Sequence, residues 1–86
     1  MDYIEEYKEQ REIAHRKALK EIREAIDKSE TTLKVKIFGG WEYTFKPIGE
    51  SGFVAGNGNF FDRIHSDSVS TEIAIKIVEA LRKKKC

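Results

Sequence analysis

The sequence predicts an α+β fold: a two-layer sandwich in the order α-β-β-β(-β)-α, with an antiparallel sheet of three or four strands and both helices on one face. Three observations indicate it. Residues 3–28 contain no Gly or Pro, residues 33–46 alternate like a β-hairpin, and residues 69–81 carry an apolar stripe at helical spacing. One antiparallel sheet packed against two amphipathic helices is the simplest way to bury these apolar surfaces together.

The size and composition predict a single α+β domain over residues 1–86. Hydrophobic residues make up 40% and charged residues 36% of the chain, which is typical of a small soluble domain. The net charge of +1 gives no overall attraction to nucleic acid or to an anionic membrane. The only cysteine is Cys86, so no internal disulfide can form, and neither a signal peptide nor a membrane span is recognisable. We therefore expect a cytoplasmic protein without a membrane partner.

The helix predicted over residues 3–28 has an apolar stripe that is clean only in its second half. In the first half Lys8, Arg11 and His15 fall within the stripe. The stripe consists of Ile4, Tyr7, Ala14, Ala18, Leu19, Ile22, Ala25 and Ile26. The helix should run about 39 Å, whereas a six-residue strand runs only about 20 Å. Its first turns should therefore extend beyond the sheet, into solvent or onto a partner.

The hairpin sequence selects one register. A two-residue loop at Gly39-Gly40 would place Val35 opposite Thr44 and mix apolar with polar residues on each face. A three-residue loop, 38–40, gives one apolar face instead. It pairs Leu33 with Phe45, Val35 with Tyr43, Ile37 with Trp41, Lys36 with Glu42 and Lys34 with Thr44. This register predicts that Ile37 and Trp41 both point toward the helices.

The remaining elements follow from turn and capping residues. Pro47 should end the second strand or lie at an edge. A short strand is expected at 53–55 and a fourth at 60–64, before a helix capped by Asp67 or Ser68. The predicted core is Ala18, Ile22, Ala25, Ile26, Leu33, Val35, Ile37, Tyr43, Phe45, Val54, Ile73, Ile77, Val78 and Leu81.

The residue patterns predict no enzyme, no catalytic residue, no metal site and no cofactor. His65 between Asp62 and Asp67 could hold a metal ion or act in acid–base chemistry, but a strand-to-helix connector explains these residues better. Cys86 at the end of the chain is poorly placed for nucleophilic attack. The Gly-x-Gly at 56–58 is followed by aromatic strand residues rather than by the helix that a phosphate loop needs.

The function we expect is that of a small non-enzymatic binding or regulatory protein, of inhibitor or adaptor type, which contacts another protein or a second copy of itself. Candidate binding residues are those that the predicted core leaves over: Tyr3, Tyr7, Arg11, Phe38, Asn57, Asn59, Phe61, Arg63 and Ile75. One alternative is nucleic-acid backbone binding through the lysine-bearing sheet face and the basic C-terminal tail. Another is a nucleotide-like ligand at the Asn57–Arg63 turn, where amides, rings and a guanidinium are close in sequence. The basic residues of the first helix mostly have carboxylates four residues away, which is typical of a solvated face.

Overall fold

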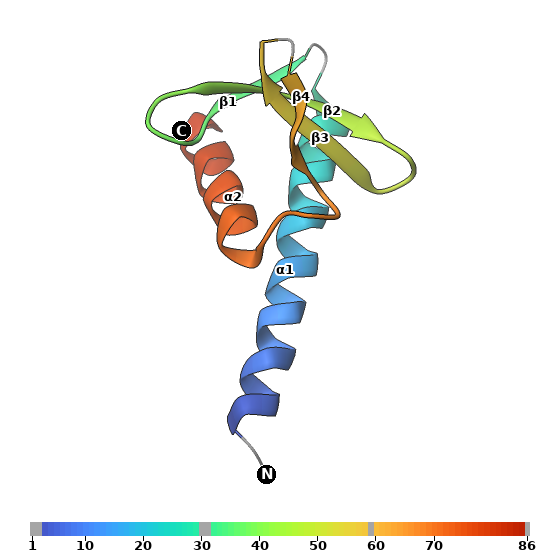
Figure 1. Cartoon of the computed structure of the whole chain (residues 1–86), viewed down its shortest axis with the longest axis vertical. Helices are drawn as coiled ribbons and strands as arrows, with labels where there is room; N and C mark the ends of the chain where they lie inside the picture. The colour runs from blue at the N-terminus through green and yellow to red at the C-terminus, as the bar shows by residue number, and fades with distance from the viewer. Residues whose placement is uncertain (1–2, 30–31, 59, 86) are drawn as a thin grey trace.

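A computed structural model describes residues 3–29, 32–58 and 60–85, and only the backbone for Tyr3, 60–62 and 84–85. The elements are α1 (Tyr3–Lys28), β1 (Leu33–Lys36), β2 (Glu42–Ile48), β3 (Gly52–Asn57), β4 (Phe60–His65) and α2 (Thr71–Lys85) (Figure 1). The four strands form one antiparallel sheet in the order β1-β2-β3-β4. The predicted α+β class is confirmed, and the described chain has the fourth strand.

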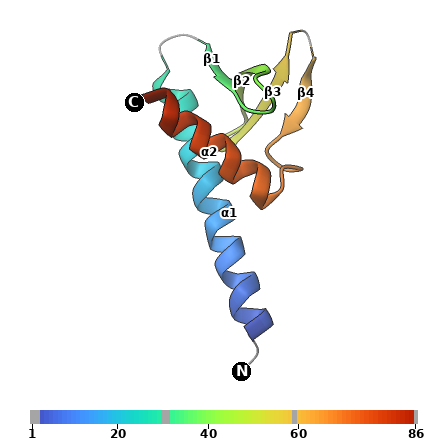
Figure 2. The same ribbon diagram turned by 90° about the vertical axis from the view of Figure 1, so that its left-hand side faces the viewer.

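Both helices lie on the same side of the sheet and pack against each other (Figures 1 and 2). Between the two layers is one apolar core, to which both helices and all four strands contribute. Its buried members are Ala18, Ile22, Ile26, Val35, Phe45, Phe53, Ala55, Ile64, Val69, Ala74, Ile77, Val78 and Leu81. The predicted members Ala25, Leu33, Ile37, Tyr43 and Ile73 are half-buried against this cluster.

The hairpin has the predicted register, with Val35 opposite Tyr43 and Leu33 opposite Phe45. The loop closes with hydrogen bonds from the Ile37 N–H to the Trp41 carbonyl (3.2 Å) and from the Trp41 N–H to the Phe38 carbonyl (3.0 Å). Both loop glycines have positive φ, +58° at Gly39 and +87° at Gly40, where a side chain would be strained.

The inward orientation predicted for Trp41 is wrong, because its side chain is 61% exposed. Trp41 precedes the first residue of β2 and lies against the glycine loop, with its Cδ1 3.8 Å from the position that a Cβ on Gly39 would take. The apolar face therefore ends one pair before the loop.

The face predicted for the middle of β3 is also wrong. Ala55 pairs with Phe45, so Phe53 and Ala55 face the helices and are fully buried. Val54 is buried, but it lies on the opposite face, where its pairing partners are Lys46 and His65. Alternation alone could not choose between the faces, since Phe53, Val54 and Ala55 are all apolar.

Helix α2 begins three residues later than Ser68, and its cap is Ser70 rather than Asp67 or Ser68. The Ser70 hydroxyl accepts a hydrogen bond from the Ile73 N–H at 3.3 Å. The preceding residue, Val69, is buried in the core, in the position of a hydrophobic staple. Pro47 lies inside β2 rather than at its end, beyond the last residue that pairs with β1, so its missing N–H interrupts no pairing on that side.

Candidate protein-binding surfaces

The first turns of α1 project beyond the rest of the molecule (Figure 1). They make the longest dimension 47 Å, against 28 and 22 Å for the other two. Ile4 and Tyr7 continue the apolar stripe of Ala18 and Ile22, yet their exposed fractions are 66% and 60%. We call residues 3–12 the projecting segment. The predicted excess length of this helix is confirmed.

The projecting segment ends where α2 begins to cover α1. The Arg11 guanidinium donates to the Tyr7 hydroxyl at 3.1 Å, lies 5.7 Å from the Tyr7 ring centre, and forms an ion pair with Glu72. This guanidinium holds the pKa of Glu72 below its ordinary value, and Glu72 in turn raises the pKa of Arg11. One turn further on, the His15 Nε2–H donates to the Val69 carbonyl at 3.0 Å. Arg11 and His15 thus connect α1 to the start of α2 and to the residue two positions before it.

Arg23 has a structural role that the sequence did not indicate. Its Nη1 donates to the carbonyls of Gly52 (2.6 Å) and Ile48 (3.2 Å), and its Nε to Asp27 at 2.9 Å. The side chain is only 17% exposed. The sequence alone shows Arg23 four residues before Asp27, which is typical of a solvated pair. The hydrogen bonds of Arg23 to the β2–β3 turn depend on tertiary structure.

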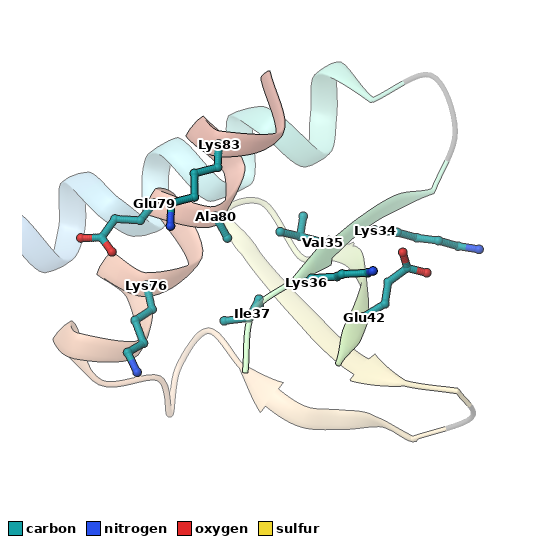
Figure 3. Close-up of a pocket in the computed structure, with 9 residues that line it drawn as sticks. All are labelled: Lys34, Val35, Lys36, Ile37, Glu42, Lys76, Glu79, Ala80 and Lys83. Atoms are coloured by element: carbon teal, nitrogen blue, oxygen red, sulfur yellow. The ribbon is translucent and has the colours of Figure 1, made fainter. Parts of the chain in front are cut away.

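A groove runs between the edge strand β1 and helix α2 (Figure 3). Val35 and Ile37 point toward α2, where Ala80 lies, while Lys34 and Lys36 point to the other side of the strand (Figure 3). The volume is about 570 Å³, and the lining residues are Lys34, Val35, Lys36, Ile37, Glu42, Lys76, Glu79, Ala80 and Lys83. We call this the β1–α2 groove. It is apolar on its floor and carries twice as many lysines as glutamates.

Phe38 follows Ile37 in the chain, and the prediction that it lies off the core is wrong. Its ring packs edge-on against Tyr43, with centroids 5.9 Å apart, and is half-buried against the core. The Lys76 Nζ lies 5.8 Å from the centre of the same ring. Ile75 on α2 is exposed, as its position off the stripe predicts.

Two further predicted candidates, Asn57 on β3 and Arg63 on β4, lie on the sheet. A shallow hollow on the outer face of the sheet is lined by Lys34, Gly39, Gly40, Trp41, Glu42, Thr44, Asn57 and Gly58. Arg63 is exposed on β4. The side chains of Tyr3 and Phe61, and the whole of Asn59, lie outside the described residues. The candidates therefore belong to separate surfaces: Tyr7 and Arg11 on the projecting segment, and Asn57 at the far end of the sheet.

His65 makes hydrogen bonds within the connector that links β4 to α2, and the side chain of Asp62 lies outside the described residues. Its Nδ1 accepts a hydrogen bond from the Asp67 N–H at 3.2 Å, and its carbonyl accepts one from the Ser68 N–H at 2.9 Å. Among the residues whose side chains are described, no three His, Cys, Asp or Glu are grouped as metal ligands would be. In the same part of the chain, no helix has the length and apolar character needed to cross a bilayer.

Comparison with known protein families, with curated proteins and with solved structures finds no match to this chain. The surfaces themselves are therefore the evidence for its function.

Proposed function

We propose that this chain is a non-enzymatic binding protein that inserts its projecting segment into an apolar groove of another protein. The observation that carries the proposal is the apolar stripe of α1. The stripe continues beyond the point at which α2 begins, so Ile4 and Tyr7 are left exposed. Where the apolar face of a helix extends beyond the elements that cover it, that part of the face is available for a partner.

The spacing of the exposed residues fits helix-in-groove recognition. Ile4, Tyr7 and Arg11 are at positions i, i+3 and i+7 of one helix face, the spacing at which such helices place their anchors. Tyr and Arg are also the residue types enriched at binding hot spots. The segment carries four glutamates against Lys8 and Arg11 over residues 5–12. The complementary groove should therefore have a basic rim.

A second copy of the chain fits this segment less well than a different protein. The segment is about 15 Å long, and two such helices would bury far less than the roughly 800 Å² per partner of a stable interface. Two copies would also bring their glutamates together. A partner with a concave surface can enclose more of the same helix and supply the missing positive charge.

The test is a comparison of tagged variants used to capture proteins from the source cells. The Ile4→Ala/Tyr7→Ala double variant should lose a partner that the wild type retains, by tenfold or more in quantitative mass spectrometry. Ile13→Ala is the matched control, since Ile13 is 57% exposed on the other side of the same helix. The untagged full chain should compete for the same partner, and the untagged double variant should not.

Three outcomes would contradict the proposal: no retained protein, equal retention by all variants, or failure of the untagged full chain to compete. Sedimentation equilibrium tests whether the chain associates with itself through this segment. A dimer that dissociates in the double variant would assign the segment to self-association instead.

A second candidate function, nucleic-acid binding, is favoured by the exposed Trp41 on the outer sheet face. Trp41 lines the shallow hollow together with Lys34, Thr44 and Asn57, a combination of stacking surface, cation and amide that suits a single strand. An oligonucleotide should then quench the fluorescence of Trp41, the only tryptophan, and the affinity should fall steeply with added salt. Unchanged fluorescence at low salt would remove this candidate.

A further inference from the structure

The β1–α2 groove lies away from the projecting segment, near the C-terminal end of α2 (Figures 1 and 3). We propose that it binds an extended segment of another protein, which adds to β1 as a fifth strand and alternates acidic with aliphatic residues. This is a second binding activity, independent of the function proposed for α1.

The backbone of β1 can accept a further strand. Within the described sheet β1 is an edge strand, paired with β2 alone. The Ile37 N–H donates to the Trp41 carbonyl across the hairpin, so by antiparallel alternation the N–H and C=O of Lys36 point away from β2. They point toward the space in which an added strand would lie. Main-chain bonds of this kind supply the affinity in strand addition.

The floor of the groove would receive every second side chain of the added strand. Val35 and Ile37 point toward α2, and Ala80 lies across from them (Figure 3). Val35 is buried, while Ile37 and Ala80 are half-buried and present aliphatic surface. The volume, about 570 Å³, is in the usual range for a ligand site. Aliphatic side chains would extend the core here and cover this surface.

The remaining side chains of the added strand would meet lysines. Lys34 and Lys36 stand on the outer face of β1, where cross-strand neighbours of opposite charge stabilise pairing. Lys76 and Lys83 border the groove on α2, on the same side as the aliphatic floor, so they attract the acidic strand through space rather than pair with its outward side chains. Glu42 and Glu79 are also in the lining, but the lysines outnumber them two to one. Acidic residues at alternate positions therefore complement the groove.

A second copy of this chain is a poor occupant. Pairing β1 with β1 would place the exposed Lys34 and Lys36 of one chain beside those of the other, and like charges in adjacent strands destabilise pairing. Lysines on an edge strand are a common means of preventing such self-pairing. An acidic segment turns the same lysines into favourable contacts, which is why the proposal names a different protein with acidic alternation.

The test uses a fluorescent eight-residue peptide in which Glu alternates with Val or Ile, titrated against the full chain by anisotropy. Saturable binding at micromolar peptide is expected. A scrambled peptide of the same composition, and one with N-methylated alternate amides, should not saturate. Lys36→Glu/Lys76→Glu should weaken binding about tenfold or more. Lys17→Glu/Lys20→Glu, an equal charge change on exposed positions of α1, should leave binding within about twofold.

Hydrogen exchange identifies strand addition directly. The amide of Lys36 should exchange at least tenfold more slowly with the alternating peptide bound. The proposal is overturned if the peptide does not bind, if either altered peptide binds as well, or if exchange at Lys36 is unchanged. A ten-residue thymidine oligonucleotide that binds more tightly than the peptide, and is weakened by the same Lys36→Glu/Lys76→Glu change, would assign the lysines to nucleic acid instead. These readouts do not involve Ile4 or Tyr7, so this inference can fail while the proposed function stands, and the reverse.

Discussion

The two ends of α1 show how one continuous helix can serve two purposes. Ile22, in the C-terminal half, is completely buried, whereas Ile4, on the same helix face, is two-thirds exposed. The difference lies in which elements lie opposite each half: α2 and the sheet cover the C-terminal half, whereas Ile4 and Tyr7 lie beyond the Arg11–Glu72 contact at which α2 begins. Figure 2 shows this end of α1 extending past both layers. Helix formation and burial are therefore separable here. The projecting segment is helical by extension of a helix that the core stabilises elsewhere.

The largest contrast should be between the two isoleucines. Ile22→Ala should lower the free energy of unfolding by about 3–4 kcal/mol, because it removes a fully buried side chain and leaves a cavity. Ile4→Ala should lower it by less than about 0.5 kcal/mol, because its side chain is mostly in solvent. Urea denaturation followed by circular dichroism measures both. Equal effects would mean that the projecting segment is covered in the free protein.

The next contrast is between two arginines of the same helix. Arg23→Ala should cost about 2–3 kcal/mol, because it removes charged hydrogen bonds to the carbonyls of the β2–β3 turn. Arg16→Ala removes only an exposed pair with Glu12 and should cost at most about 0.5 kcal/mol. Arg23→Lys should behave more like the alanine variant, since an ammonium cannot reproduce the planar fork. A loss below that of Arg16→Ala would show that Arg23 does not anchor the turn.

The smallest effect concerns the Arg11–Glu72 pair at the boundary between the two halves. The pKa of Glu72 is lowered by Arg11, so the stabilisation is present above the ordinary carboxyl pKa and is lost as the pH falls through the lowered value. NMR titration of the Glu72 carboxyl carbon should show this lowered pKa. Arg11→Ala should raise the pKa of Glu72, because the Arg11 hydrogen bond is the largest cause of its lowering, and Lys8→Ala should leave it low. An unchanged Glu72 pKa in Arg11→Ala would remove the pair as the tie between α1 and α2.

Sequence reasoning succeeded where the pattern was redundant. The hairpin register followed from several apolar pairs that only one loop length satisfies, and the excess length of α1 followed from comparing rise per residue in helices and strands. It failed where the pattern was degenerate. In the run Phe53-Val54-Ala55 every residue is apolar, so only the pairing of Ala55 with Phe45 decides which face is inward. The prediction that Trp41 points inward failed for a related reason, because no helix packs over this apolar residue beside the loop.

The sequence by itself determined the order of elements, the helix boundaries to within a few residues, and the hairpin pairing, because each depends on local spacing and turn chemistry. Tertiary structure alone decided the position of the β1–α2 groove and the use of Arg23 and Phe38 within the fold. The physical reason is that exposure depends on which elements lie opposite one another, and residues such as Phe38 and Lys76 meet only when distant segments pack.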